Sequence, residues 1–180
     1  MKKQTLTMPE APASGMSDFW HVVVITLVVC AACLPFLRPQ LIITHETLNP
    51  LVRLAQLHKF FGDGQLYVRW MPDLCFGYGY PLFNFYAPLF YYAAEIFVLA
   101  GTGLISALYA SCFFWWLLSG LGMYLFSRIF LGGRGALVAA IAYILAPYHI
   151  ADVYVRAAFA EMAGLAFFPF HEEPEEQNSG

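Results

Sequence analysis

Long apolar runs separated by short polar segments are the dominant pattern of the chain. A helix needs about 20 apolar residues to cross a bilayer, and the pattern predicts four such spans, at about 19–38, 81–100, 104–127 and 135–150. A fifth, partial run covers 157–170. The pattern therefore predicts an all-α integral membrane protein with about four to five transmembrane helices.

The two ends of the chain are expected to lie outside the spans. Residues 1–18 are polar and without an apolar period, which predicts a disordered N-terminal tail. A cleaved signal peptide is the competing interpretation, but the first run is long and no clean small-residue cleavage site follows it, which favours an uncleaved anchor. The acidic tail 171–180 interrupts an apolar segment, so we expect a truncated or frame-shifted product of a longer gene.

The extramembrane loop 40–80 contains one amphipathic helix. Asn49 and Pro50 are typical of an N-cap and a first helical position, and Gly62-Asp63-Gly64 predicts the end of the helix. Its apolar face has Leu51, Leu54, Leu57 and Phe61, and its polar face has Arg53, Gln56 and Lys59. A basic face opposite an apolar stripe predicts a helix that lies in the membrane interface.

An aromatic stretch, Arg69 to Tyr92, follows this helix and contains three prolines and two glycines. It is too rich in turn-forming residues for one helix and too apolar for a solvent loop. Tyr and Trp prefer the membrane–water boundary. The stretch therefore predicts a structured loop that turns into the membrane.

Composition supports a membrane protein. Of the 180 residues, 60% are hydrophobic and only 12% are charged, against roughly a quarter charged in soluble domains. The net charge of −3 comes largely from the acidic tail, so nothing suggests nucleic acid, and membrane lipids are the expected partners. The predicted location is the plasma (inner) membrane, with multiple crossings.

Basic residues give conflicting indications of orientation. The N-terminal lysines and the short loop with Arg128 and Arg134 both favour the cytoplasm. An even number of crossings must then separate them, yet three apolar runs lie between. Either the run 81–100 does not cross the membrane fully, or the short loop does not follow the preference of basic residues for the cytoplasm. We place the loop 40–80 on the outer side of the membrane.

The four cysteines form no metal or disulfide framework in the sequence. Cys30 and Cys33 have redox-like spacing but lie in an apolar run, where small-residue packing is expected. Cys75 is expected to be a small buried hydrophobe.

Glu46 is the strongest catalytic candidate, because a carboxylate just beyond a span, beside His45, suits a general base acting on a hydroxyl. An ordinary solvated loop residue is its alternative. Arg69 and Arg156 are candidate phosphate contacts, since a guanidinium binds phosphate through two parallel hydrogen bonds. Their alternatives are headgroup contact for Arg69 and pairing with Asp152, four residues earlier, for Arg156.

Other polar residues have structural interpretations as well. Asp73 is a candidate for substrate binding beside Arg69 and is equally suited to pair with it. Glu95 is an acid within a predicted span. Placing an acid in a membrane costs free energy, so Glu95 marks either a functional or a structural site. His58 falls in the apolar arc of the amphipathic helix and is expected to be a satisfied histidine. His45 and Glu46 alone are too few for a metal site.

A resemblance to a known family rests on three segments. These are 64–74 (GQLYVRWMPDL), 77–89 (GYGYPLFNFYAPL), and Ala146-Pro147-Tyr148-His149 with Asp152, Tyr154-Val155-Arg156 and Glu161. They resemble the bacterial membrane proteins labelled "6-pyruvoyl-tetrahydropterin synthase-related", whose architecture is similar to GT-C glycosyltransferases. The pterin label carries no mechanism here, because nothing in the chain has the architecture of the soluble pterin synthases.

The resemblance implies a GT-C-like helical bundle that uses a polyprenyl-phosphate-linked sugar. In GT-C enzymes an acidic residue soon after the first span acts as base or binds metal. Here that position reads His45-Glu46, so only Glu46 retains the carboxylate. Arg69 and Arg156 match the family pattern. No cofactor is specified, although the resemblance leaves a divalent metal ion open.

The sequence therefore predicts the N-terminal part of a membrane glycosyltransferase that transfers a sugar to an envelope glycan or lipid. Because relatives in this family continue for more spans, the chain alone is expected to be inactive. The alternative is a non-catalytic membrane protein, either a lipid-binding or assembly subunit or an inactive gene remnant.

Overall fold

The computed structural model describes residues 15–38 and 40–171, and these confirm an all-α protein. Strand pairing within the described residues is limited to one isolated bridge, Met71 with Tyr80. The helices are α1 (Gly15–Ala32), η1 (Leu34–Leu37), α2 (Asn49–Gly62), η2 (Cys75–Gly77), α3 (Leu82–Phe85), α4 (Leu89–Leu99), α5 (Leu104–Phe130), α6 (Gly133–Ile144), α7 (Pro147–Ala151), the π-helical η3 (Asp152–Arg156) and α8 (Phe159–His171).

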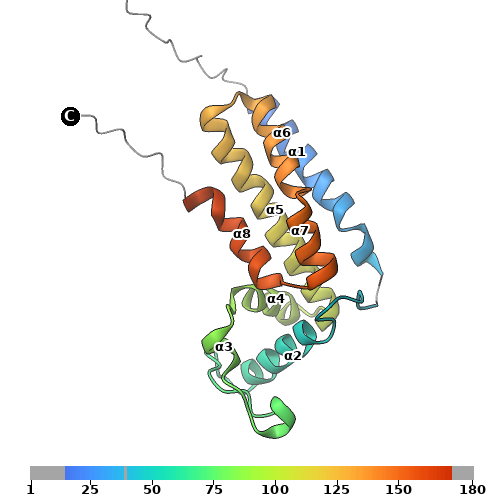
Figure 1. Cartoon of the computed structure of the whole chain (residues 1–180), viewed down its shortest axis with the longest axis vertical. Helices are drawn as coiled ribbons and strands as arrows, with labels where there is room; N and C mark the ends of the chain where they lie inside the picture. The colour runs from blue at the N-terminus through green and yellow to red at the C-terminus, as the bar shows by residue number, and fades with distance from the viewer. Residues whose placement is uncertain (1–14, 39, 172–180) are drawn as a thin grey trace, which may run out of the picture.

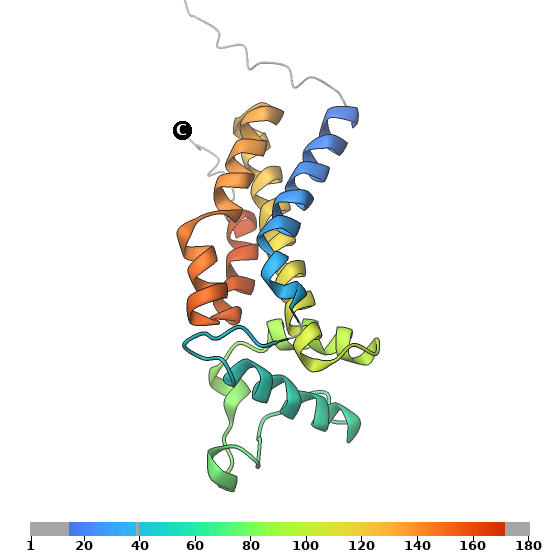
Figure 2. The ribbon, with the colours of Figure 1, turned by 90° about the vertical axis from the view of Figure 1, so that its right-hand side faces the viewer.

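The helices form an upright bundle closed at one end by a transverse layer. Helices α1, α5, α6, α7 and α8 run along the long axis, while α2 and α4 lie across the lower end of the bundle (Figures 1 and 2). The segment around η2 projects beyond α2 at the extreme end of the molecule in both views. This arrangement separates the lengthwise bundle from the transverse layer formed by α2 and α4.

Helix α5 is the centre of the bundle and contacts α1, α2, α4, α6 and α8. Small residues on α5 permit this close packing, because a Cβ at Gly120 would lie 2.5 Å from Ile144 and 3.2 Å from Ile25. Trp116 is fully buried and donates its indole N–H to the carbonyl of Ile144 at 3.0 Å. The contact satisfies a backbone acceptor at the end of α6, where the helix is interrupted.

Two helical stretches, Leu104–Phe130 and Gly133–Arg156, are long and apolar enough to cross a membrane. The second contains the predicted span 135–150 and extends beyond the predicted end to Arg156. Pro147 occupies the first turn of α7, a position at which proline needs no helical N–H partner. Helix formation therefore resumes after the interruption and continues to Arg156.

The predicted span 81–100, which Pro88 was expected to interrupt, is divided into two separate helices. The chain forms α3, leaves the helical conformation at Tyr86, and starts α4 after Pro88. Helix α4 has 11 residues, fewer than the ~20 that a crossing needs, and it lies across the end of the bundle (Figure 1). Proline disfavours a helical conformation in the residue before it, which explains the interruption.

Helix α2 is amphipathic as predicted, but its apolar stripe faces protein. Leu54 and Leu57 are fully buried, and α2 contacts α4 and α5. The stripe is therefore not available to insert into a membrane interface. The helix ends at Gly62 as expected, whereas its N-cap is Leu48, one residue before the predicted Asn49.

The start of α1 lies beside the end of α5. The Asp18 carboxylate and the Arg128 guanidinium form an ion pair, and the Tyr124 hydroxyl donates to Asp18 at 3.1 Å. His21 Nδ1 is 3.0 Å from the same hydroxyl. We call Asp18, His21, Tyr124 and Arg128 the Asp18–Arg128 cluster; it defines the end of the bundle opposite the transverse layer.

Two predictions for chain ends and cysteines need correction. Residues 15–18 belong to α1 and not to a disordered tail, while the rest of that tail and residues 172–180 lie outside the described residues. Cys75 is exposed and not buried. It lies in a tight turn whose backbone conformation turns the side chain outward.

Candidate functional site

The loop that carries the candidate acid is fixed to the end of the bundle by backbone contacts. The His45 backbone N–H donates to the carbonyl of Val155 at 2.9 Å. The Tyr109 hydroxyl accepts from the Ile42 N–H and donates to the Gln40 carbonyl, both at 3.0 Å. The loop 40–48 therefore lies against the segment that carries Arg156.

Glu46 is held by a basic residue of α2. Its Oε2 is 3.1 Å from Nη2 of Arg53, and the Glu46 side chain remains partly exposed. The Arg53 guanidinium also lies over the Tyr86 ring, 4.1 Å from its centroid, and donates to the Tyr91 hydroxyl at 3.3 Å. Arg53 is thus rigidly placed and in turn fixes the position of the Glu46 carboxylate.

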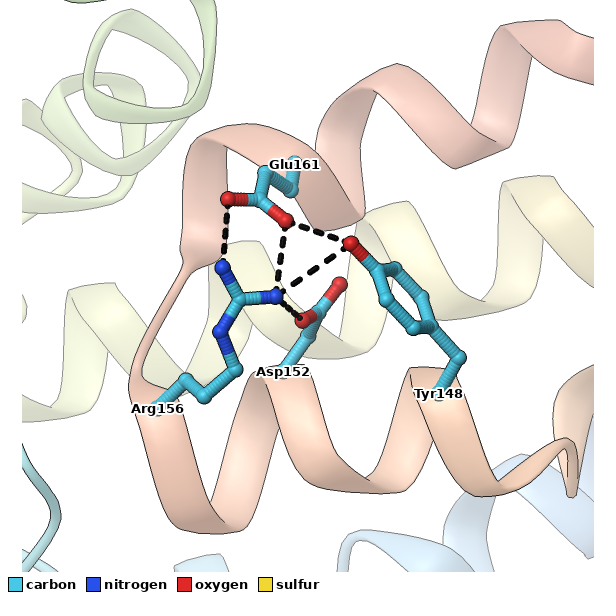
Figure 3. Close-up of polar contacts among 4 residues, drawn as sticks. All are labelled: Tyr148, Asp152, Arg156 and Glu161. Atoms are coloured by element: carbon cyan, nitrogen blue, oxygen red, sulfur yellow. Dashed lines mark hydrogen bonds and ion pairs between the residues drawn. The ribbon is translucent and has the colours of Figure 1, made fainter.

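Arg156 joins two acids from different helices (Figure 3). Its Nη1 donates to Asp152 Oδ1 at 2.7 Å, which confirms the predicted pair at one-turn spacing. Both terminal nitrogens also donate to the Glu161 carboxylate, each at 2.8 Å. The Tyr148 hydroxyl donates to Glu161 at 2.7 Å. We call these four residues the Arg156 cluster.

A local irregularity of the backbone builds this cluster. Residues 152–156 form a π-helical turn, and Ala157 then adopts a left-handed conformation with φ of 56°. The reversal turns the chain into α8, so Glu161 faces back toward Arg156. Single π-helical turns are rare and frequently occur at functional sites. Asp152 is fully buried, and its Oδ2 has no hydrogen-bond partner in the structure.

An apolar pocket lies where the loop, α5 and the turn after η3 meet. It is small and partly open to solvent, and its lining residues are Phe36, Leu41, Ile42, Thr44, Thr47, Pro50, Leu108, Tyr109, Val153, Ala157 and Phe159. Thr44 and Thr47 flank Glu46 in sequence, and Val153 and Ala157 flank Arg156. The pocket is thus lined by the segments that carry the two candidate residues, while the Glu46 and Arg156 side chains themselves are not among its lining residues.

The other predicted site residues belong to a different part of the molecule. Asp73 pairs with Lys59 at 2.5 Å and accepts from Gln56 at 3.3 Å, so its partner is α2 and not Arg69. The hydrogen bond from Lys59 lowers the pKa of Asp73. Arg69 is exposed, with its guanidinium 5.1 Å from the Tyr67 ring centroid. Neither contact joins these residues to Glu46 or Arg156.

Sequence reasoning missed a buried pair between α2 and α4. His58 Nδ1 lies 2.8 Å from Oε1 of Glu95; the Glu95 side chain is 1% exposed and that of His58 47%. Each residue was unusual in its own helix, His58 within an apolar arc and Glu95 within an apolar run. The sequence therefore marked both residues as unusual, but it did not show that they contact each other. Only the packing of α2 across α4 brings His58 and Glu95 together.

No group of three or more His, Cys, Asp or Glu side chains that suits a metal ion occurs among residues 15–38 and 40–171. Comparison of the chain with protein-family models, curated proteins and solved structures found no match. The site is therefore interpreted from its own chemistry.

Proposed function

We propose that the bundle is embedded in a membrane and crosses it several times. Large apolar side chains are exposed on its outer surface, among them Phe19, Trp20 and Leu27 of α1, Leu125 and Ile129 of α5, Val138 of α6, and Phe167 and Phe168 of α8. Such surfaces are rare on soluble monomers and mark contact with lipid or protein. The two stretches long enough to cross a membrane support the same interpretation.

The positions of the polar clusters fit a bilayer. Gly133 lies next to His21 of the Asp18–Arg128 cluster, and Asp152 belongs to the Arg156 cluster at the other end. At 1.5 Å per residue, the helical stretch between Gly133 and Asp152 is roughly 28 Å long. The hydrocarbon core of a bilayer is about 30 Å thick, so each cluster would lie near one interface.

On this proposal, the basic segments are compatible with a single orientation. Because α4 lies across the bundle, only α1 and α5 run between the N-terminus and the basic loop at Arg128 and Arg134. The number of crossings between them is then even, and both basic segments lie on the cytoplasmic side. The loop 40–80 and the apolar pocket lie on the opposite side.

We further propose that the protein acts as a GT-C-like glycosyltransferase on a polyprenyl-phosphate-linked sugar. The observation that carries the proposal is the backbone contact between His45 and Val155, which joins the segments that carry Glu46 and Arg156 beside one apolar pocket. An apolar pocket near a membrane surface suits part of a lipid chain, a cation suits its phosphate, and a partly exposed carboxylate suits the acceptor hydroxyl.

Arg156 would exchange one partner when phosphate binds. Its pair with Glu161 is exposed on both sides, and exposed ion pairs contribute only about 0–1 kcal/mol. Its pair with Asp152 is buried on the acid side and would keep the guanidinium in place. A phosphate would therefore displace Glu161 from the guanidinium while Asp152 stays bound.

The test is transfer of radiolabelled sugar from polyprenyl-phosphate glucose, mannose or arabinose to an envelope extract, with the full-length protein in proteoliposomes. Glu46→Gln is expected to lose at least about a hundredfold of the rate, the lower bound for a general base. Asp63→Asn removes an acid from the same loop and is the matched control, with an unchanged rate. Normal transfer by Glu46→Gln would remove the proposed role of Glu46, whereas absence of transfer by the unsubstituted protein would favour a non-catalytic lipid-binding protein.

A further inference from the structure

The segment 68–80, which we call the aromatic hairpin, holds its tip in a strained conformation. Two consecutive residues have positive φ, Cys75 at 52° and Phe76 at 58°. Side chains other than glycine adopt this region at a cost, and for a bulky residue it is a clear outlier. The side chain of Phe76 is fully exposed at 105%, and that of Tyr78 is 86% exposed. Strain that presents an aromatic ring to solvent is typical of a binding element.

The base of the hairpin is rigid. Met71 and Tyr80 exchange two backbone hydrogen bonds, both 3.0 Å long. The Trp70 ring lies directly against Gly79, where a Cβ would come within 2.5 Å of it. Asp73 is bonded to Lys59 and Gln56 of α2. The tip is thus preorganised, which lowers the entropy that binding would cost.

The position and chemistry of the tip restrict its ligand. The hairpin lies beyond α2, on the far side from the bundle, in both views (Figures 1 and 2). With the bundle in a bilayer, the tip would stand clear of the hydrocarbon core. Its exposed side chains include four aromatic rings, Trp70, Phe76, Tyr78 and Tyr80, three of them with a polar donor group, and the cation Arg69. The one acid of the hairpin is neutralised by Lys59.

We propose that the aromatic hairpin binds the sugar rings of a glycan. A sugar ring presents an apolar C–H face that packs on an aromatic ring, while its hydroxyls accept from the Tyr78 hydroxyl and the Trp70 indole. The inference rests on the proposed function in one respect, since it makes a glycan, and not a lipid, the acceptor of the transfer. The hairpin would hold the acceptor on the outer side of the membrane.

The test measures binding by saturation-transfer NMR to the whole protein in lipid nanodiscs. The probes are tetrasaccharides of glucose, of N-acetylglucosamine and of galacturonic acid. We expect millimolar or tighter binding of at least one of them, and a roughly tenfold weaker Kd for Phe76→Ala with Tyr78→Ala. Phe130→Ala removes an exposed ring at the opposite end and is expected to leave the Kd unchanged. Phe76→Gly removes ring and strain together, so reduced binding by a well-folded variant supports the proposal.

Three results would overturn the inference. One is no saturable binding of any of these tetrasaccharides, and another is equal binding by Phe76→Gly. The third is quenching of a fluorophore on Cys75 by spin-labelled lipid, which would place the tip in the bilayer. If glycan binding is absent but Glu46→Gln abolishes transfer, the proposed function stands without this inference. If the protein binds a glycan but the unsubstituted protein transfers no sugar, this inference stands without the proposed function.

Discussion

Asp18 and Arg128 form an ion pair that joins the beginning of α1 to the end of α5. The Tyr124 hydroxyl donates to Asp18, and Arg128 Nη1 donates to Tyr124 at 3.1 Å, so the contact is a network and not a single pair. The network places the two chain segments at one end of the bundle. For a bundle that crosses a membrane, it requires α1 and α5 to be consecutive antiparallel crossings.

Cysteine labelling from the two sides of the membrane tests this topology. The native Cys75 is exposed at the hairpin and serves as one reporter in a chain whose other cysteines are replaced by alanine. Arg134→Cys, with Cys75 also replaced, reports on the loop after α5. In sealed spheroplasts we expect an impermeant maleimide to label Cys75 and not Arg134→Cys. Labelling of both from the same side would contradict the account.

The buried carboxylate of Glu95 is expected to depend on His58 for stability. Removing His58 leaves a buried carboxyl oxygen without its hydrogen-bond partner, which typically costs about 1–3 kcal/mol. Because His58 is half-exposed, we expect His58→Ala to lower the free energy of unfolding by about 2 kcal/mol. Unfolding in mixed micelles monitored by circular dichroism measures it.

A double-mutant cycle separates this pairing from simple loss of packing. Glu95→Gln removes the charge, and the loss caused by His58→Ala should fall to about 1 kcal/mol or less in that background. Equal losses in both backgrounds would show that the two side chains do not interact energetically.

Acid is expected to loosen the aromatic hairpin from α2. The hydrogen bond from Lys59 lowers the pKa of Asp73 below its ordinary value of 3.8. The ionised Asp73 carboxylate therefore contributes its full stabilisation at pH values above the ordinary pKa of the unfolded chain. This stabilisation is lost as the pH falls through the lower pKa that Asp73 has in the folded protein. The anisotropy of a fluorophore on Cys75 should decrease in this acidic window, and Asp73→Asn should remove the step. An unchanged pH profile in Asp73→Asn would refute the contact.

Gly79 is expected to be irreplaceable in the hairpin. It has φ of +82°, and a Cβ there would collide with the Trp70 ring at 2.5 Å. Gly79→Ala should therefore destabilise the hairpin by about 1–2 kcal/mol from the backbone alone. Protease sensitivity of the segment measures the change. Gly62→Ala is the control, because nothing lies within 4 Å of its added methyl group; similar sensitivity of both variants would count against the described packing.

Much of the helical framework was predictable from the sequence, because the spacing of apolar residues and the positions of helix-breaking residues depend only on nearby positions in the chain. The run 104–127 corresponds to α5, and Gly62 ends α2 where the turn sequence predicted it. The pair of Asp152 and Arg156 followed from one-turn spacing alone. These features depend on residues close in sequence.

The rest depends on contacts between distant segments. The run 81–100 is apolar enough for a span, and only its prolines hinted that it divides into α3 and α4. Once α4 lies across the bundle, its acid Glu95 meets His58, and the stripe of α2 faces protein instead of lipid. Likewise, the partner of Asp73 comes from α2, and no periodicity within 40–80 specifies that fold-back.

Photo-crosslinking with a benzophenone-bearing polyprenyl phosphate tests the central proposal most directly. The protein in proteoliposomes is irradiated with the probe, and the modified residues are located by mass spectrometry. We predict crosslinks at pocket residues such as Phe36, Tyr109 and Phe159, reduced by competing unlabelled polyprenyl phosphate and by Arg156→Gln. Crosslinks confined to the Asp18–Arg128 cluster, or an unchanged pattern in the presence of competitor, would contradict the account.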